Sequence, residues 1–525
     1  MQQNQFSAPD SSTNPYDVII IGAGLSGLVT AAYLTKAGRR VLVCEQGSQI
    51  GGLFNSFQRQ GFHFDGGIKA IENSAVMMPM LAQLGLLDQV QLEPNPVAMI
   101  IGNTTQPIAS WQDVSAYFAV LASLFPAEEA GLRRIQRDTQ RIFEILDGML
   151  TFPPPNFDLP GEAGKEARAA WSRQHGKKML RFPQILRFFN QELLPYLRSH
   201  LQDEHLINLV SDLFPQGTRV FFGLGYFRLF LDYYYPREGI AAIPQVLAKA
   251  IRSWGGEIRL KARVEQVLLK EGNACGVRLE NGEEIGAGHV VAASNLRQAL
   301  TGLLPESNLP VSFAEKLNTA EVSQSVFNVF LGLDVPPEAL DLPPYHHFFY
   351  HPDLRGINET DRLSLPDYFA HVPQEISIPC LANPALAPAG KTGINLSAMT
   401  VWEYNGGWEQ DPAEYARLKQ EYAWQMIRSV EKIIPGLSDH IELMFAATPR
   451  TIATMTSNQH GAIMGWSYDR KRTMPRGNFL QMGASIYTPI PRLLTAGHWA
   501  YSPGGSPVAV MTGKLAAEAI LNQDS

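Results

Sequence analysis

Three glycines near the start of the chain, Gly22, Gly24 and Gly27, follow the spacing G-x-G-x-x-G between an apolar run and a helical pattern. In such a setting the first glycine permits a tight turn, the second lets a phosphate approach the backbone, and the third lets helix pack on strand. The N-terminus of the helix then presents N–H groups to an anion. Glu45 ends the next apolar run, where an acid can bind ribose hydroxyls. The pattern predicts a dinucleotide site.

Further glycine pairs indicate which dinucleotide is bound. Gly51-Gly52 and then Gly66-Gly67 extend the bare backbone well past the adenosine end of the site. An extended FAD needs such a strip, because its ribityl chain and ring must lie against main chain. A second helix N-terminus at Ser506–Val508 can stabilise negative charge on a reduced flavin. These features favour FAD over a nicotinamide cofactor.

Catalytic groups are less clearly marked. No G-x-S-x-G nucleophile motif is present. Lys69, just after Gly67-Ile68, is the catalytic residue that we name, and Glu72 and His498 are alternatives. For each of the three, a supporting or phosphate-facing role stays open, since a flavoenzyme can work mainly by positioning a C–H bond for hydride transfer.

A histidine-rich stretch, "YHHFFYH", contains His346, His347 and His351. A metal site would need further ligands in a suitable geometry, and no nearby carboxylate is placed to supply one. We therefore expect no metal and interpret this stretch as a surface of histidines packed on aromatic rings.

The elements that must position these residues alternate in type along the chain. Asp17–Ile21 and Arg40–Cys44 read as buried strands on either side of a helix, Leu25–Lys36, that Gly38 closes. A second β-rich block with a turn at Asn281-Gly282 follows much later. Near the end, Arg492–Gly497 reads as a strand and Ser506 caps a final helix.

We therefore expect an α/β fold, a doubly wound (Rossmann-like) FAD-binding domain with an inserted mixed α+β substrate domain. After a disordered lead, 1–15, the FAD-binding domain takes 16–104, 236–305 and 447–525. The substrate domain takes 106–235 and 306–446, and a proline-rich connector, Thr151–Gly161, divides its helical part.

Composition excludes several classes of protein. The 525 residues carry a net charge of -7, which argues against a nucleic-acid binder. Three cysteines far apart form no disulfide framework and fit a reducing compartment. The polar N-terminus lacks the apolar core of a signal peptide, and no apolar run is long enough to span a bilayer. We expect a cytoplasmic protein, and the sequence does not indicate an oligomeric state.

Two stretches could meet an apolar substrate or its solvent. "RVFFGLGYFRLFLDYYY" (Arg219–Tyr235) is either the wall of a long tunnel, with Gly223 and Gly225 lining it, or ordinary core packing. Lys165–Phe189 interleaves seven basic residues with aromatic ones. It is either a membrane-binding surface, to which each basic residue near an anionic surface adds about 1 kcal/mol, or a solvated helix face.

Several quoted stretches together resemble a known family. "GLSGLVTAAYLTKAGRRVLVCEQGSQIGG", "GFHFDGGI", "RVEQVL" and the C-terminal glycine helix are similar to those of phytoene desaturases, carotenoid isomerases and retinol saturases, within the amine-oxidase-like flavoproteins. "NPALAPAGKTGINL" resembles another segment of that family, with Asn383 where Asp is usual. Leu53 stands where many relatives have a basic residue, and "GHWAYSPGGSP" also departs from the desaturase pattern.

The resemblance implies a role along FAD for each matched residue. Val264 would meet the adenine through its backbone, and Gly67 and Ile68 would lie near the flavin ring. Together, the motifs and the resemblance give the FAD-binding set Gly22, Ala23, Gly24, Leu25, Ser26, Gly27, Glu45, Gly51, Gly52, Leu53, Gly67, Ile68, Val264, Gly497, Ser506, Pro507 and Val508.

The function that the resemblance implies is FAD-dependent desaturation, saturation or cis–trans isomerisation of a C=C bond in a hydrophobic isoprenoid or polyene. Two alternatives stay open. One is an amine-oxidase-like enzyme with a smaller substrate, although relatives of that kind usually have Gly-Glu where this chain has Gly497-His498. The other is a flavin-free prenyl-chain escort like the GDP-dissociation inhibitors. The sequence leaves the substrate, the direction of reaction and the terminal electron acceptor undetermined.

Overall fold

The computed structural model describes residues 15–150, 161–212, 214–304, 309–350, 363–469, 471–474 and 479–523. The expected disordered lead, apart from Pro15, lies outside these residues, as do the proline-rich connector up to Pro160 and His351.

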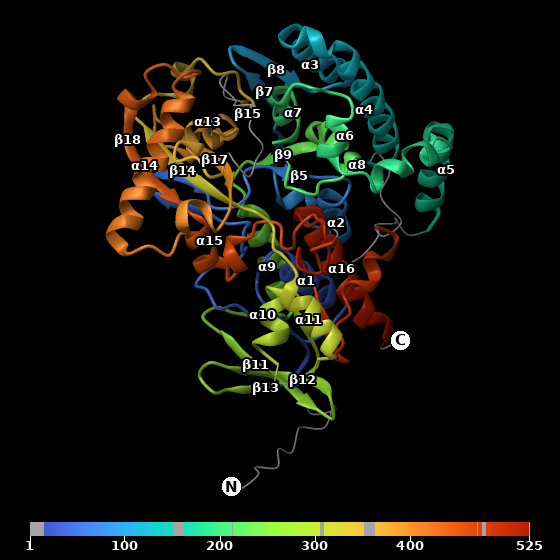
Figure 1. Cartoon of the computed structure of the whole chain (residues 1–525). Helices are drawn as coiled ribbons and strands as arrows, with labels where there is room; N and C mark the ends of the chain where they lie inside the picture. Colours follow the sequence, from blue (N-terminus) through green and yellow to red (C-terminus); the bar gives the residue numbers. More distant parts are fainter. Residues whose placement is uncertain are drawn as a thin grey trace.

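A parallel sheet forms the centre of the nucleotide-binding part, low in Figure 1. Its strands lie in the order β10 (Glu257–Arg259), β2 (Val41–Cys44), β1 (Tyr16–Ile21), β13 (Glu284–Ala292) and β19 (Leu493–Thr495). β13 also continues into an antiparallel meander with β12 (Asn273–Leu279) and β11 (Val264–Lys270). The predicted βαβ unit and the return of the C-terminal strand to this sheet are both confirmed.

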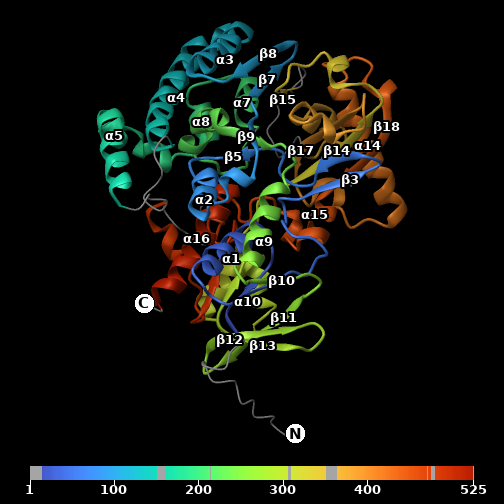
Figure 2. The same ribbon diagram turned by 180° about the vertical axis from the view of Figure 1, so that it is seen from behind.

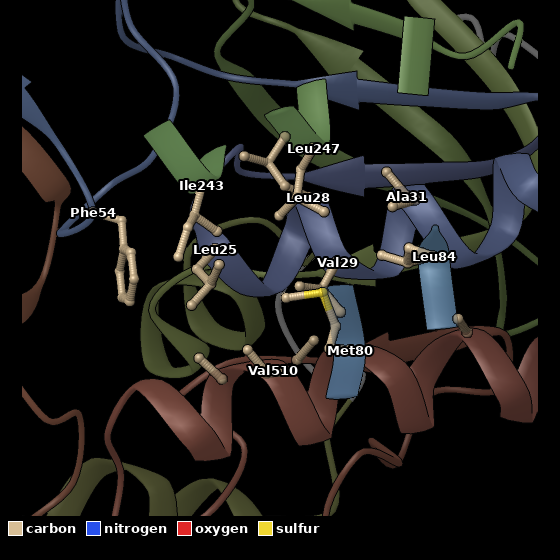
Figure 3. Close-up of a cluster of buried hydrophobic side chains, with 14 of the residues drawn as sticks. Leu25, Leu28, Val29, Ala31, Phe54, Met80, Leu84, Ile243, Leu247 and Val510 are labelled. Atoms are coloured by element: carbon tan, nitrogen blue, oxygen red, sulfur yellow. The ribbon is translucent and has the colours of Figure 1, made fainter. Parts of the chain in front are cut away.

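Among the described residues, the helices α1 (Leu25–Lys36), α2 (Met77–Leu84), α9 (Ala242–Ser253) and α16 (Ser506–Gln523) share a core with one face of this sheet. The short helices α10 (Leu296–Thr301) and α11 (Val311–Thr319) share a core with the other face. In Figure 3, Leu28 and Val29 of α1 lie among Leu247 of α9, Met80 of α2 and Val510 of α16, and all five are fully buried. Burying such side chains contributes about 1.5–3 kcal/mol each. The core therefore joins the start, the middle and the end of the chain.

The crossing of α1 and α16 is close. A Cβ on Gly513 would come within 2.7 Å of the Ser26 carbonyl oxygen. Without that Cβ the helices approach until Thr30 Oγ1 donates to the Gly513 carbonyl at 2.9 Å. This contact fixes the C-terminal helix against the start of the glycine-rich loop.

A second sheet lies in the upper part of the molecule (Figures 1 and 2). Its order is β18 (Ile441–Ala447), β14 (Ser325–Leu333), β17 (Thr392–Thr400), β16 (Gln374–Ser377), β15 (His346–Tyr350), β7 (Val97–Ile101) and β8 (Thr104–Ile108). All neighbours are antiparallel except β15 and β7. Two small sheets, β3 (Ser56–Arg59) with β4 (Phe62–Asp65), and β5 (Ile71–Glu72), β9 (Tyr233–Pro236) and β6 (Leu92–Pro94), connect the two parts.

The division into two domains stays a prediction, and strand pairing argues for one change in it. The sequence analysis puts residues up to 104 in the FAD-binding domain. In the structure β7 pairs with β15, with Val97 opposite His346, so these residues extend the second sheet. The sequence could not show this, because the residue pattern of one strand does not indicate which distant strand it pairs with.

Helices pack around the second sheet and fill the insertion. They are α3 (Trp111–Leu124), α4 (Glu129–Leu150), α5 (Gly161–Met179), α6 (Leu193–Arg198), α7 (Glu204–Ser211), α8 (Val220–Leu229), α13 (Tyr368–His371), α14 (Pro412–Val430) and α15 (Pro449–Thr456). The sequence analysis missed α3, although Ser110 caps it by accepting from Asp113 N at 3.2 Å.

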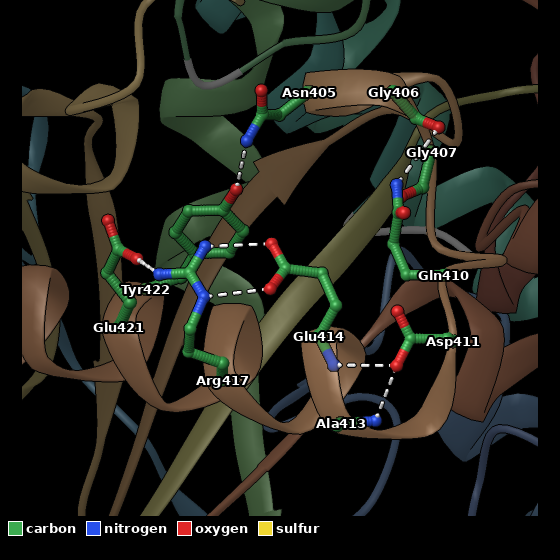
Figure 4. Close-up of polar contacts among 10 residues, drawn as sticks. All are labelled: Asn405, Gly406, Gly407, Gln410, Asp411, Ala413, Glu414, Arg417, Glu421 and Tyr422. Atoms are coloured by element: carbon green, nitrogen blue, oxygen red, sulfur yellow. Dashed lines mark hydrogen bonds and ion pairs between the residues drawn. The ribbon is translucent and has the colours of Figure 1, made fainter.

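Helix α14 shows how local sequence fixes an element (Figure 4). Asp411 accepts hydrogen bonds from the backbone N–H groups of Ala413 and Glu414 at 3.0 and 3.2 Å, which satisfies two donors of the first turn. On the exposed face Arg417 binds both oxygens of Glu414 and also Glu421. The helix begins at Pro412 and ends at Val430.

Candidate active site

A cavity of about 990 Å³ lies where the parallel sheet, the second sheet and the helical insertion meet. Fourteen of the residues predicted to bind FAD or to act in catalysis line it: Gly22, Gly24, Leu25, Ser26, Glu45, Gly51, Gly52, Leu53, Gly67, Ile68, Lys69, Val264, Gly497 and Ser506. Ala23, Gly27, Pro507 and Val508 do not line it; they belong to the same two segments. The structure therefore brings together motifs that are far apart in the sequence.

The glycine-rich loop is built as its spacing predicts. Gly22 has φ +102°, and a Cβ there would lie 2.9 Å from the Ala293 carbonyl oxygen. A Cβ on Gly27 would lie 2.1 Å from the Gly22 carbonyl oxygen, so only glycine lets α1 start this close to the turn. A Cβ on Gly24 would meet nothing within 4 Å. No side chain caps the N-terminus of α1, and its first turn contains no acidic residue. Its N–H groups are therefore available to an anion.

Glu45 has a structural role that the sequence analysis did not foresee. One carboxylate oxygen accepts from Ala23 N at 2.8 Å, and the other accepts from Gly47 N at 2.8 Å. The carboxylate thus ties the end of β2 to the glycine-rich loop. Each oxygen has a further lone pair, so binding of ribose hydroxyls is compatible with these contacts and stays a prediction.

The second glycine strip lies directly beside the first. Gly51 N donates to the Ala23 carbonyl at 2.8 Å, and Gly51 pairs with Gly24 as an isolated bridge. Further along, a Cβ on Gly67 would fall 2.0 Å from the Leu53 carbonyl oxygen. The cavity wall from Gly24 to Gly67 is therefore mostly main chain.

Asp65, in the quoted "GFHFDGG", holds this wall in place. It is fully buried and accepts from Tyr235 Oη at 2.6 Å, Ser56 Oγ at 2.7 Å and Ile240 N at 3.3 Å. These bonds join β4 to β9 and to the loop that leads into α9. Because these three hydrogen bonds lie within the fold, we infer that the Asp65 side chain positions the cavity wall.

The C-terminal segment closes the cavity near the start of α1. Gly497 has φ +105°, and a Cβ there would lie 2.9 Å from Ser26 Oγ. His498 lines the cavity between Gly465 and Gly504, where added Cβ atoms would strike its carbonyl oxygen at 2.4 Å and its own Cβ at 3.0 Å. Burial lowers the pKa of His498 to about 4, so its imidazole is neutral at physiological pH.

These features fit an extended dinucleotide. The pyrophosphate at its centre needs N–H groups that no side chain blocks, and the N-terminus of α1 supplies them. Its extended shape needs a wall without protruding side chains, and Gly24, Gly52 and Gly67 line the cavity for this purpose. The fit rests on the uncapped N-terminus of α1 and on Gly24, where an added Cβ would project into open space.

Next to Gly67 and Ile68 the lining of the cavity is polar as well as aromatic. We call this region the far end and define it by Lys69, Glu72, Tyr226, Tyr233, Val326 and Glu375, which all line the cavity. Lys69 is 4% exposed and its Nζ donates to the Gly67 carbonyl at 2.8 Å. Burial lowers the pKa of Lys69, although the negative charges of Glu375 and Asp65 oppose that effect. Its catalytic role stays a prediction.

Glu375 is the functional candidate that the sequence analysis missed. It lies on β16, and its Oε1 is 2.8 Å from His346 Nε2 on β15. Burial alone raises the pKa of Glu375, but the hydrogen bond from His346 and the charge of Lys69 outweigh it and lower the pKa overall. The one sequence feature that could have indicated this site is the histidine-rich stretch that contains His346, which we interpreted as surface.

That interpretation is wrong for the two histidines that the structure describes. His346 is 2% exposed and His347 is fully buried. Both lie on the central strand β15 of the second sheet, and His347 Nε2 is 3.0 Å from the Pro343 carbonyl oxygen. Among the described residues, no three His, Cys, Asp or Glu side chains gather as metal ligands would.

The aromatic stretch Arg219–Tyr235 contributes both to the cavity wall and to a hydrophobic core, and its role as the wall of a long tunnel stays a prediction. Tyr226 and Tyr233 line the cavity, whereas Phe227 and Phe230 are buried in a hydrophobic core. The expectation that Gly223 and Gly225 line a tunnel is wrong, because added Cβ atoms would meet Leu193 Cδ2 at 2.7 Å and Leu146 Cδ1 at 2.6 Å. These glycines permit close packing of α8 on its neighbours.

Comparisons with known proteins identify the family of the chain. Residues 25–521 match the family described as flavin containing amine oxidoreductase. Prolycopene isomerase of Daucus carota is 26% identical over 83% of this chain and 69% of its own length. All-trans-retinol 13,14-reductase of Homo sapiens is 26% identical over 93% of this chain and 83% of its own length.

Solved structures show the same fold. An oxidoreductase from Methanosarcina mazei superposes with a TM-score of 0.59 at 17% identity, covering 96% of this chain and 99% of that one. Cyclohexylamine oxidase from Brevibacterium oxydans superposes with a TM-score of 0.57 at 17% identity, covering 97% and 99%. From the family match, the relatives and the cavity together, the chain belongs to the flavin-containing amine oxidoreductase family and is an FAD-dependent oxidoreductase.

Proposed function

We propose that the protein acts on a C=C or C–C bond of a long polyene or other hydrophobic isoprenoid. The observation that carries this proposal is the far end of the cavity, where Tyr226, Tyr233 and Val326 line the same cavity as Gly67 and Ile68. An elongated apolar chain fits such an aromatic wall. The names of the relatives, a prolycopene isomerase and a retinol reductase, support the same class of substrate.

We also propose how the chain holds FAD. Gly22–Gly27 and the N-terminus of α1 would hold the pyrophosphate, Glu45 the adenosine ribose, and Val264 the adenine. Gly51, Gly52 and Leu53 would line the path of the cofactor, Gly67 and Ile68 would face the ring, and Gly497 with Ser506–Val508 would close on the ribityl chain and ring. When bound, FAD accepts or supplies a hydride at N5. The chain's own part is to bind, to orient the substrate and to exclude water.

A substrate panel tests this function. The FAD-loaded protein, oxidised and then chemically reduced, is incubated without oxygen with a cis-carotenoid, with retinol, and with putrescine and cyclohexylamine. Products are followed by chromatography and the flavin by absorbance. We expect turnover of at least one polyene and none of the amines. Rapid reduction of the flavin by an amine, with no polyene turned over, would refute the proposal in favour of an amine oxidase.

We propose that the protein binds a membrane surface and takes up its hydrophobic substrate there. The segment from α5 to the short helix Phe182–Phe189 lies at the periphery in Figures 1 and 2. Leu180 is 81% exposed and Leu186 49% exposed. Ile185 and Phe188 are buried instead, so fewer apolar side chains of this segment can contact a membrane than we expected from the sequence. Within the described residues, no helix is long and apolar enough to cross a bilayer.

The basic residues of this segment are also partly used within the protein. Lys178 lies 3.6 Å from Asp147, Arg181 3.4 Å from Glu144, and Arg187 3.3 Å from Asp138. The contact with lipid would therefore depend mainly on the two exposed leucines, with the basic residues adding a salt-dependent attraction.

Flotation with anionic vesicles tests this partner. Leu180→Asp/Leu186→Asp should abolish binding, whereas Leu124→Asp on α3, where Leu124 is 51% exposed, should float like the unmodified protein. All three should retain FAD. No binding by the unmodified protein at low salt would refute the proposal.

A further inference from the structure

Two carboxyl groups line the far end of the cavity, and their surroundings differ in kind. Glu72 comes from β5, at the edge of the helical insertion, and Glu375 comes from β16 in the second sheet. A pair of carboxyl groups whose environments favour opposite charge states is a common basis for acid and base roles in one site.

Glu72 is surrounded by groups that favour its neutral form. Burial raises its pKa, and the negative charge of Asp232 adds to this, while hydrogen bonds from Ser74 and Tyr226 oppose it without reversing the shift. Two further hydroxyl groups, those of Tyr233 and Tyr468, interact with it electrostatically.

Glu375 has the opposite surroundings. His346 lies at hydrogen-bond distance, 2.8 Å, and Lys69 acts on it through space. Its side chain is 30% exposed, and since it lines the cavity, the cavity receives that exposed edge. A carboxylate held in this way presents a fixed negative charge to whatever occupies the far end.

A chain of hydroxyl groups leads from Glu72 along the cavity wall. Tyr226 Oη lies 3.2 Å from Glu72 Oε2, and Tyr233 Oη lies 2.8 Å from Tyr226 Oη. Strand pairing fixes this arrangement, because Glu72 on β5 is directly opposite Tyr233 on β9. Burial raises the pKa of both tyrosines well above the usual value, so they stay neutral and can pass a proton on.

We propose that Glu72 is the proton donor of the reaction, acting directly or through the Tyr226–Tyr233 hydroxyl pair, and that Glu375 is the carboxylate facing the positive charge that develops on the substrate. The proposal rests on the proposed function, since it assumes a polyene at the far end. It assigns different roles to two groups that lie in the same cavity.

The step balances as follows for a polyene. The O–H bond of Glu72 breaks, the electron pair of one C=C bond forms a new C–H bond, and the neighbouring carbons share a positive charge. Loss of either hydrogen of that carbon to Glu72, after rotation about the former double bond, gives a cis–trans isomer with no net redox change. When the original hydrogen is the one lost, the isomer keeps the hydrogen that came from Glu72, and hence deuterium in D₂O. If the cation instead takes a hydride, for which reduced FAD is the reductant, one C=C bond is saturated and Glu72 is reprotonated from water.

The far end is suited to that cation. The Glu375 carboxylate supplies the opposite charge, and two aromatic residues, Tyr226 and Tyr233, line the same cavity. Because these groups are fixed before the reaction, little reorganisation accompanies the development of charge.

Glu72→Gln tests the donor, because glutamine keeps the size of the side chain but has no acidic proton. The matched control is Glu93→Gln on β6, a strand of the same three-stranded sheet, since Glu93 does not line the cavity. Polyene turnover in D₂O is measured with each FAD-loaded protein. We expect Glu72→Gln to lose about 10²–10⁴-fold in rate, as for removal of a general acid, and to lose carbon-bound deuterium in the product. Glu93→Gln should match the unmodified protein in both.

Infrared spectroscopy provides a readout that needs no substrate. The unmodified protein minus Glu72→Gln should show, at neutral pH, the C=O band of a carboxylic acid that shifts in D₂O. Absence of that band, with FAD bound and the melting temperature preserved, would overturn the proposal. So would unchanged deuterium transfer in Glu72→Gln. If the unmodified protein turns over no polyene, the proposed function fails, and the infrared band still supports or overturns Glu72 as the protonated group.

Glu375→Gln separates the second role. It should slow turnover while the carboxylic-acid band of Glu72 persists, because only the stabilising charge is removed. If Glu375→Gln removes that band and Glu72→Gln does not, the assignment of the two groups is reversed and the proposal is overturned.

Discussion

Replacing Glu45 with alanine separates two roles of one carboxylate. The sequence gives it a role in binding ribose, and the structure adds hydrogen bonds from the backbone N–H groups of Ala23 and Gly47, both at 2.8 Å. A hydrogen bond to a charged group contributes about 1.5–3 kcal/mol. Glu45 is only partly buried, so we take the lower end and expect Glu45→Ala to cost the FAD-free protein about 2–4 kcal/mol in the free energy of unfolding.

The loss of FAD affinity should come on top of this. Removing a hydrogen-bonded acid from the ribose is expected to cost a further 1.5–3 kcal/mol, or about 10- to 150-fold in Kd. Denaturant unfolding of the FAD-free protein and fluorescence titration with FAD measure the two effects separately. Glu280→Ala, an exposed acid next to the β12–β13 turn, is the control and should change neither.

The two measurements also distinguish the possible outcomes. A stable FAD-free variant with weakened FAD binding would leave the carboxylate as a ribose ligand and refute its role in holding the loop. A destabilised variant whose FAD affinity is unchanged would refute the ribose contact. Unchanged values in both would refute the reasoning altogether.

Three further predictions concern stability. Gly225→Ala should destabilise the protein by about 1–3 kcal/mol through overpacking against Leu146, whereas Gly176→Ala on α5, whose Cβ would meet nothing within 4 Å, should be neutral or stabilising in chemical denaturation. Burial lowers the pKa of His347 from 6.5 to about 4. Its contribution to the free energy of unfolding is therefore fully present above about pH 6.5 and is lost as pH falls toward 4, by roughly 3 kcal/mol at most. His347→Gln should make the free energy of unfolding fall less steeply in this pH range. Asp65→Asn should lower the melting temperature and loosen FAD, because Tyr235 and Ser56 both donate to that carboxylate; an unchanged melting temperature would contradict this.

The cofactor cradle could be predicted because its information is local. The spacing of Gly22, Gly24 and Gly27 and the acid after the next strand specify a turn, a helix start and a contact at the end of β2. Each depends on backbone conformation over a few residues, which residue type controls directly. The structure accordingly adds a structural role for Glu45, and its ribose contact stays a prediction.

The far end could not be predicted in the same way. Glu375 and His346 meet because β15 and β16 are neighbours in an antiparallel sheet, and Lys69 reaches them from a segment almost 300 residues earlier in the chain. No pattern within any one of these segments states the pairing. Gly223 and Gly225 illustrate the converse error, because a glycine in an aromatic helix can line a cavity or permit close packing, and only the neighbours Leu193 and Leu146 decide which.

The proposed proton donor explains how one cavity could serve chemistries that look unrelated. The relatives are named for an isomerisation, without net redox change, and for a reduction. Both outcomes can follow from the same protonated polyene, since the cation either loses a proton to Glu72 or accepts a hydride. Which happens would depend on where the ring of FAD lies relative to the charged carbons, and hence on the cradle around Gly67 rather than on the acid. Substitutions at the far end should therefore change the rate of both reactions together, whereas substitutions along the Leu53–Gly67 wall should change their ratio. If Tyr233→Phe altered the ratio of isomerised to saturated product without changing the total rate, a shared proton-transfer step would be ruled out.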